Sequence, residues 1–207
     1  EAAIVAVRNE LSEADGFNRL VLQAGLSWPQ ISVLRAYAKY MRQIGSPFAP
    51  ESIEDALHRN AGVARLLVAG FAAKFDPAVP AGERLARVDE AMSRLSDAID
   101  VVDSLDHDRI LRSYATMIEA TDRTNHFKEE PGSAGRCLAL KLRPIAIPDT
   151  PAPRPRFEVF VHSPRVEGVH MRFGPIARGG LRWSDRRDDF RTEVLGLAKA
   201  QMVKNSL

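Results

Sequence analysis

The residues whose types and order could do chemistry lie close together near the C-terminal end of the sequence. The segment 177–190, ARGGLRWSDRRDDF, sets two glycines between arginines and follows them with a tryptophan and interleaved charges. Gly179 and Gly180 can take a positive φ and offer bare backbone N–H groups to a small anion. Arg178 and Arg182 flank them, and a guanidinium can hold a carboxylate through two parallel hydrogen bonds. The segment therefore predicts an anion clamp.

A structural explanation of the same segment stays open. Asp185, Asp188 and Asp189 could neutralise the arginines in a surface ion-pair network of little energetic value, while the glycines only turn the chain. The glycine pair also matches neither GxGxxG nor a P-loop, so it gives little support for a site that cradles nucleotide phosphates.

A second group of candidates lies on the helix expected from about residue 188 to the end. One stripe of that helix, at 100° per residue, carries three apolar residues and then an amide and an ammonium: Phe190, Val194, Leu197, Gln201 and Lys204. An unpaired amide and ammonium are costly on an inward face, so an anionic ligand would supply the missing partner. Alternatively, Lys204 interacts with the helix dipole and reaches outward to solvent.

Strands must position these groups. Alternating apolar residues predict three strands, at about 138–142, 157–161 and 169–173. In the second strand, Phe157, Val159 and Val161 form the expected apolar side, and a turn at Ser163-Pro164 pairs it with the third strand in a hairpin. Strand, glycine turn and helix then make the start of an α/β unit, where ligands gather at strand ends.

The first part of the sequence has helical periodicity. The expected helices begin after Ser27, after Pro50, near Gly62 and near Leu85, with a return helix capped by Asp106. The fourth helix has apolar residues in alternating steps of three and four: Leu85, Val88, Met92, Leu95, Ile99 and Val102. This pattern predicts an antiparallel helical hairpin. Its seam is either an ordinary core contact or an oligomer or inter-domain contact.

The fold class expected from these patterns is α+β, with an N-terminal helical bundle followed by the beginning of an α/β substrate-binding domain whose sheet is incomplete. The aperiodic stretch 128–133 predicts the boundary, giving domains 1–131 and 132–207. Residues 1–131 carry 15 Lys and Arg against 20 Asp and Glu, and residues 132–207 carry 14 against 7. The basic second part indicates an anionic partner: nucleic acid, a nucleotide or a carboxylate metabolite.

Several classes of protein are disfavoured. The aspartates among the arginines, and the lack of a known DNA or RNA motif, argue against nucleic acid. No apolar run approaches the roughly 20 residues of a bilayer span, so we expect no membrane partner. The single cysteine, Cys137, fits a cytoplasmic protein, and the isolated histidines fit no metal site. The chain starts without methionine and stops within a helical pattern, so we expect a piece of a longer protein.

The runs FEVFVHSPRVEGVHMR and GPIARGGLRWSDRRDDFRTEVLGLAKAQMVKNSL closely resemble the start of the substrate domain in the large NAD-specific glutamate dehydrogenases of bacteria. The resemblance covers about residues 138–207, and helical sequence of the kind found in those long chains precedes it. GGLRWSDR and KAQMVKN are long motifs in the right order, which makes the match specific.

The resemblance implies roles for particular residues. Arg178 occupies the place of the basic residue that grips the side-chain carboxylate of glutamate, which is lysine in the shorter hexameric enzymes. Gln201 and Lys204 match the pair that holds the α-carboxylate, and Gly179 and Gly180 would give the substrate access to backbone. The family's catalytic lysine and its Rossmann-like NAD domain would lie outside this sequence, so we expect no catalytic, cofactor-binding or metal-binding residue here.

The resemblance also implies the activity of the parent enzyme, the NAD-dependent conversion of L-glutamate to 2-oxoglutarate and ammonium in the cytoplasm by a homo-oligomer. This section would position the substrate and would not turn over alone. The alternative from another class is a helical interaction or assembly scaffold without catalysis of its own.

Overall fold

The computed structural model describes residues 1–128, 137–175 and 179–204, with side chains described as far as Gln201. The helices in this part are α1 (Ala2–Arg8), α2 (Leu20–Gln23), α3 (Trp28–Gln43), α4 (Pro50–Arg59), α5 (Ala61–Phe75), α6 (Ala81–Asp100), α7 (Leu105–Ala120) and α8 (Phe190–Lys204). Short 3₁₀ turns are found at Gly16–Arg19 and Pro144–Ala146. The strands are β1 (Thr121–Thr124), β2 (Leu138–Leu142), β3 (Phe157–His162) and β4 (Glu167–Arg172).

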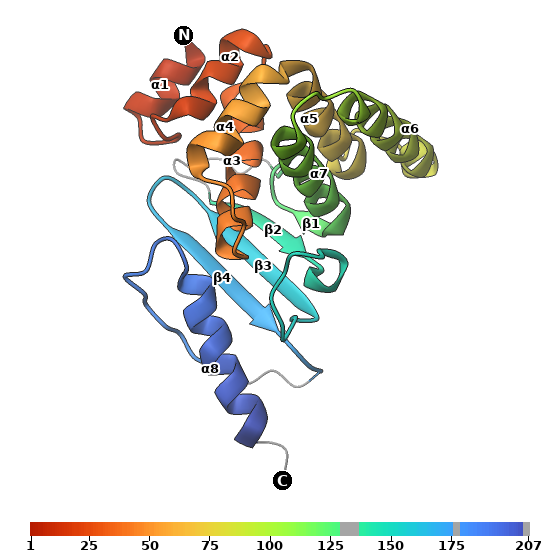
Figure 1. Ribbon diagram of the computed structural model, residues 1–207. Coiled ribbons are helices and arrows are strands. Elements are labelled where there is room, and N and C mark those ends of the chain that lie inside the picture. The colour runs from red at the N-terminus through yellow and green to blue at the C-terminus, as the bar shows by residue number, and fades with distance from the viewer. Residues whose placement is uncertain (129–136, 176–178, 205–207) are drawn as a thin grey trace.

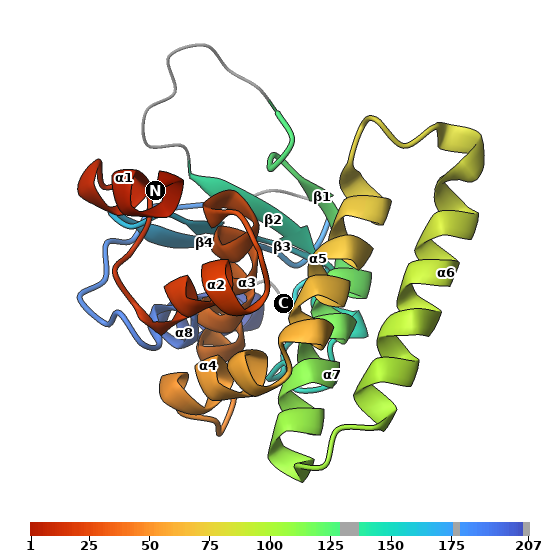
Figure 2. The same cartoon turned by 90° about the horizontal axis from the view of Figure 1, so that it is seen from above.

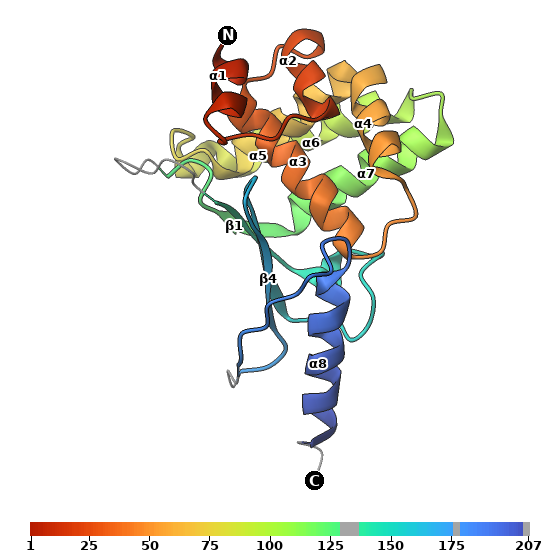
Figure 3. The ribbon, with the colours of Figure 1, turned by 90° about the vertical axis from the view of Figure 1, so that its left-hand side faces the viewer.

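The strands form an antiparallel sheet in the order β1-β2-β3-β4, and the helices α1 to α7 gather at one end of it (Figure 1). Seen from above, α6 lies at the periphery of the bundle (Figure 2). Helix α3 runs from the bundle onto the sheet, and α8 continues along the same side of the sheet (Figure 3). The expected α+β class, with its incomplete sheet, is confirmed.

One hydrophobic core joins the helices to the sheet. Leu140, Leu142 and Phe160 are fully buried on the sheet face that α3 covers, and the rings of Tyr40 and Phe160 lie 5.4 Å apart. Strand β1 precedes the expected boundary at 131/132 and yet pairs with β2 beyond it. The boundary itself lies outside the described residues and stays a prediction.

The local signals for the first helices are confirmed. Ser27 caps α3 in a reciprocal capping box with Gln30, whose side chain accepts from the Ser27 backbone N–H at 2.8 Å. The helix stops before Gly45, whose φ of 90° suits glycine alone at little cost. Helix α4 begins at Pro50, and α5 ends before Asp76.

Two expectations for the helical hairpin need correction. Ser104, not Asp106, caps α7, because its hydroxyl accepts from the His107 backbone N–H at 3.4 Å. In α6 only the C-terminal part of the apolar seam is buried: Leu95 is 0% exposed, whereas Leu85 is 73% exposed. Helix α6 packs against α5 and α7, and Arg84 in its first turn donates to the backbone carbonyl of Lys74 near the end of α5 at 2.8 Å.

The expected inward side of β3 is wrong by one residue. The buried positions are Glu158, Phe160 and His162, and the alternate residues, including Val159, are only half-buried. Alternation of apolar residues predicts the opposite face, but it assumes that charged groups lie outside. Here two charged side chains lie inside because each meets oppositely charged partners, as described below.

Candidate functional site

The described part of the glycine segment, residues 179–189, lies between β4 and α8 and is largely exposed. Gly179 and Gly180 are exposed, and a Cβ added to either would meet no described atom within 4 Å. The described glycines with a recorded positive φ are Gly25 and Gly45. Because both positions 179 and 180 are open, packing against the described residues does not require glycine there, and the access of an anion to this backbone stays a prediction. Arg178, the predicted neighbour, lies outside the described residues.

Arg182 is committed to a carboxylate on α8. Its Nε and one Nη each lie 2.8 Å from Glu193 Oε1, and the Ser184 hydroxyl donates to Glu193 Oε2 at 2.6 Å. The Ser184 hydrogen bond and then the Arg182 guanidinium hold the pKa of Glu193 below its usual value. The predicted clamp of two arginines is therefore not formed by Arg182, whose role is to fold the segment back onto α8.

The next arginine and the aspartates form the surface network that the sequence allowed. Arg186 pairs with Asp189, with one contact of 2.8 Å from Nε, and Arg42 of α3 pairs with Asp188 at 2.8 Å. These groups are largely exposed, so each pair adds little stability. Their effect is to fix the path of the chain into α8.

Gln43, the last residue of α3, clamps the start of α8. Its amide donates to the backbone carbonyl of Arg187 at 2.8 Å and accepts from the backbone N–H of Arg191 at 3.0 Å. Because the first N–H groups of a helix lack partners within the helix, this side chain acts as a cap supplied from another element. Gln43 is itself buried, which makes the clamp part of the core.

A buried ion pair reinforces the clamp. Arg191 Nε and Nη2 donate in parallel to the two carboxylate oxygens of Glu158 on β3, each at 2.8 Å, and the two side chains are 1% and 0% exposed. Burial acts to lower the pKa of Arg191, but the hydrogen bonds and charge of Glu158 outweigh it and raise the pKa. Arg191 therefore stays charged inside the protein.

The pair sets the rotation of α8. Among the described side chains of α8, those of Arg191 and Leu195 are buried, whereas Leu197 is 50% exposed and Gln201 is exposed. The expected inward stripe through Leu197 and Gln201 is therefore wrong, because anchoring Arg191 turns an adjacent face of the helix towards the sheet. Lys204 lies in the last turn of α8, and its side chain is outside the described part.

The second half of α8 projects past the sheet, towards the end of the molecule at which β4 also ends (Figures 1 and 3). The turn after β4 is held by Arg172, which donates to the carbonyls of Gly174 at 3.2 Å and Pro175 at 2.8 Å. The turn after β4 and the second half of α8 thus lie towards the same end of the molecule. Groups from both elements would need this arrangement to hold one ligand.

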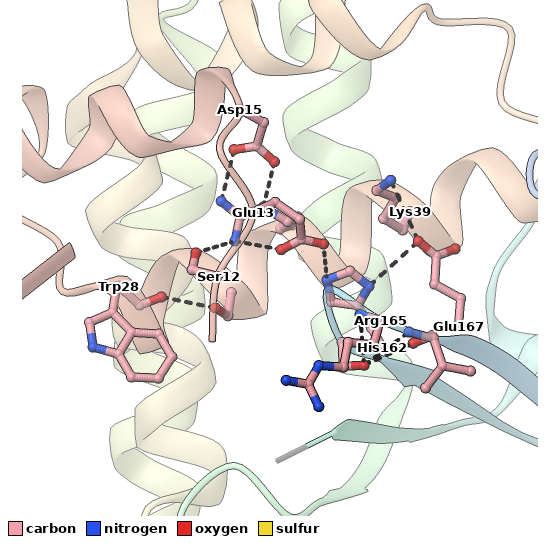
Figure 4. A network of polar contacts seen from close by, with 12 residues as sticks. Ser12, Glu13, Asp15, Trp28, Lys39, His162, Arg165 and Glu167 are labelled. Atoms are coloured by element: carbon pink, nitrogen blue, oxygen red, sulfur yellow. Dashed lines mark hydrogen bonds and ion pairs between the residues drawn. The ribbon is translucent and has the colours of Figure 1, made fainter. Parts of the chain in front are cut away.

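A second polar cluster lies at the opposite end of β3. Figure 4 shows the ring of His162 between the carboxylates of Glu13 and Glu167, at 3.2 Å and 3.6 Å. Burial acts to lower the pKa of His162, but the two carboxylates outweigh it and raise the pKa. Arg35 extends the cluster, with a bidentate contact to Asp15 at 2.6 Å and 2.8 Å.

The His162 cluster joins the N-terminal segment to the sheet. Both ring nitrogens of His162 face carboxylates of the protein at ion-pair distance, so the cluster is best explained as structural. Sequence reasoning missed both buried charges on β3. The available signal was a strand whose alternate positions hold Glu158 and His162. Across the described ranges, no group of three His, Cys, Asp or Glu side chains could hold a metal ion, and no helix could cross a membrane.

Comparison with known proteins shows that both the helical part and the sheet with α8 match segments of one enzyme family. The family described as bacterial NAD-glutamate dehydrogenase, catalytic domain, matches residues 94–207, and glutamate dehydrogenase helical motif 3 matches residues 12–77. An NAD-specific glutamate dehydrogenase of Mycobacterium tuberculosis is 54% identical over 99% of the chain. The chain belongs to the bacterial NAD-glutamate dehydrogenase family.

Two further NAD-specific glutamate dehydrogenases agree. The one from Halomonas elongata is 47% identical over 95% of the chain, and the one from Pseudomonas aeruginosa is 46% identical over 99%. The chain spans 12–13% of the length of these relatives. In this chain, Gln43 falls in the helical-motif match and Arg191 in the catalytic-domain match, so the clamp at α8 links the two family segments.

Proposed function

We propose that the chain is the section of an NAD-dependent glutamate dehydrogenase that holds the two carboxylates of the substrate. The observation that carries the proposal is the 54% identity over 99% of the chain to an NAD-specific glutamate dehydrogenase. The reaction of the whole enzyme would convert L-glutamate, NAD⁺ and water to 2-oxoglutarate, ammonium, NADH and a proton. Arg178 would bind the side-chain carboxylate, and Gln201 and Lys204 the α-carboxylate, with Gly179 and Gly180 leaving room for the substrate.

The geometry supports a positioning role. The start of α8 is fixed by Gln43 and by the Arg191–Glu158 pair, while the half that carries Gln201 and Lys204 projects beyond the sheet with Gln201 exposed. Holding both ends of a substrate fixes its α-carbon for hydride transfer, and such orientation is a large part of catalysis. In water the charges of Arg178 and Lys204 would be solvated, so their effect on the substrate depends on the rest of the enzyme closing over them.

NAD accepts the hydride when bound. The sequence contains no GxGxxG, and the described residues show no strand, glycine turn and helix of the dinucleotide-binding type. We therefore assign no NAD-binding residue to this chain. The chain's own contribution is to bind and orient glutamate. We extend the proposal to a cytoplasmic homo-oligomer, which native mass spectrometry of the whole enzyme would test.

The proposal is tested by Lys204→Ala in the whole enzyme, with Lys199→Ala on an exposed part of the same helix as the matched control. Loss of a charge-assisted contact of about 1.5–3 kcal/mol predicts a glutamate KM that rises roughly 10- to 150-fold, with the KM for NAD unchanged. Lys199→Ala is expected to leave both constants near wild type. Equal glutamate KM values for the two variants would remove Lys204 from the site.

The scaffold alternative is less well supported for the helical part. The helical part shares one hydrophobic core with the sheet and supplies the Gln43 clamp. Its contacts within this chain therefore support α8.

A further inference from the structure

The side of the sheet that faces away from the helices contains a pocket of about 440 Å³. Side chains from three neighbouring strands and from the residue before β3 line this pocket: Lys141, Arg156, Phe157, Val159, His170 and Arg172. Pockets of about 300–1,000 Å³ are typical of small-molecule sites. This pocket is distinct from the contacts that anchor α8, because α8 lies on the other side of the sheet (Figure 3).

Strand pairing brings the basic residues together. Val159 pairs with Lys141 on one side and His170 on the other, so these three form one cross-strand row. Phe157 pairs with Arg172 in the next row of the same face. Neighbouring strands are about 4.8 Å apart and alternate residues about 6.8 Å apart along a strand, so these side chains start from positions close enough to contact one small ligand.

The cations of this pocket have no carboxylate partner in the described part of the chain. Lys141 Nζ lies 4.4 Å and Arg156 Cζ 5.5 Å from the centre of the same Phe157 ring, so two like charges share one aromatic group. Among the described residues, Arg172 donates to the backbone carbonyls of Gly174 and Pro175. By contrast, the buried cation on the other side of the sheet, Arg191, is matched by Glu158.

Converging cations without counter-charges raise each other's electrostatic cost, and an anion placed between them would relieve it. We propose that this pocket binds a small polyanion that carries at least two phosphate or carboxylate groups. Lys141 and Arg156 bind its charged groups, with Arg172 and His170 at the far side, and Phe157 and Val159 contact its uncharged part. The pocket lining ends at Gly174-Pro175, a few residues before the glycine segment in the chain, and includes no residue of α8.

The experiment is calorimetric titration of the whole enzyme with inorganic pyrophosphate and, separately, with citrate. The test variants are Lys141→Ala and Arg156→Ala, and the matched control is Arg94→Ala, an exposed arginine on α6. We expect binding of at least one probe to the wild type, weakened tenfold or more by each test variant, since each removes a charge-assisted contact. Arg94→Ala is expected to bind as the wild type does. Unchanged Tm values would show that the variants are folded.

The two probes distinguish the source of the charge: stronger binding of pyrophosphate identifies a phosphate-bearing ligand, and stronger binding of citrate a polycarboxylate. Absence of binding of both at millimolar concentration would overturn the proposal, and would mean that another part of the enzyme covers this face. Binding that the test variants leave unchanged would also overturn it. Competition of the probe with glutamate, together with a raised glutamate KM in the variants, would assign the pocket to the substrate site instead.

The glutamate KM separates this inference from the proposed function. Lys141→Ala and Arg156→Ala are expected to leave it unchanged, whereas Lys204→Ala is expected to raise it. Each proposal can therefore fail without the other.

Discussion

Replacing Glu158 by glutamine would test whether the buried ion pair holds α8 in place. The substitution keeps the size of the side chain but leaves the Arg191 guanidinium charged, 1% exposed and without its counter-charge. One of the two contacts of 2.8 Å is then lost, because the amide nitrogen of glutamine cannot accept from the guanidinium, and the other contact is no longer ionic. Breaking a buried pair by removing one partner costs about 3–5 kcal/mol, because the remaining charge is uncompensated.

Peptide-resolved hydrogen exchange of the whole enzyme measures that loss where it occurs. If α8 exchanges by opening away from the sheet, a loss of about 3–5 kcal/mol speeds exchange of its amides roughly a hundred- to several-thousandfold. Exchange in α6, which does not contact the pair, is expected to stay near its wild-type rate. The glutamate KM is expected to rise as well, since the same helix carries Gln201 and Lys204.

Two controls make the result specific. Asp189→Asn breaks an exposed pair in the same segment and is expected to change exchange in α8 little, because solvent screens that pair. The double substitution Glu158→Leu with Arg191→Met replaces the ion pair by apolar groups and is expected to recover most of the lost protection. Unaltered exchange in α8 for Glu158→Gln would refute the reasoning, as would a double variant that is no better protected than the single one.

Two other predictions follow from the core and the His162 cluster. Leu95→Ala is expected to lower the free energy of unfolding by about 2–5 kcal/mol, whereas Leu85→Ala is expected to change it by no more than about 0.5 kcal/mol. Chemical denaturation followed by circular dichroism measures both values. Equal losses would show that Leu85 is covered in the whole enzyme. Because the pKa of His162 is raised from 6.5 and those of Glu13 and Glu167 are lowered from 4.5, the cluster stabilises most between pH 4.5 and 6.5. Its contribution falls as pH rises through the folded pKa of His162, or drops through those of the carboxylates. The Tm difference between wild type and His162→Asn should therefore shrink above pH 6.5, and a constant difference would contradict the assignment.

The sequence by itself determined the local structure and the family. Ser27 with Gln30, Pro50 and the glycine at 45 mark the bounds of α3 and α4 because caps, prolines and left-handed residues act within a few positions. The hairpin of β3 and β4 also follows from alternation and a short turn. The motifs around Gly179 and Lys204 indicated the family, which the comparisons confirm.

Only the tertiary structure decided which faces of β3 and α8 point inward. Periodicity places Phe157, Val159 and Leu197 inside, because it ranks faces by their apolar content alone. The observed faces depend on Glu158 meeting Arg191, 33 residues away, and on Gln43 meeting the backbone of Arg191, 148 residues away. A buried charge is favourable only where its partner is also buried. That condition concerns pairs distant in sequence, so no short-range pattern contains it.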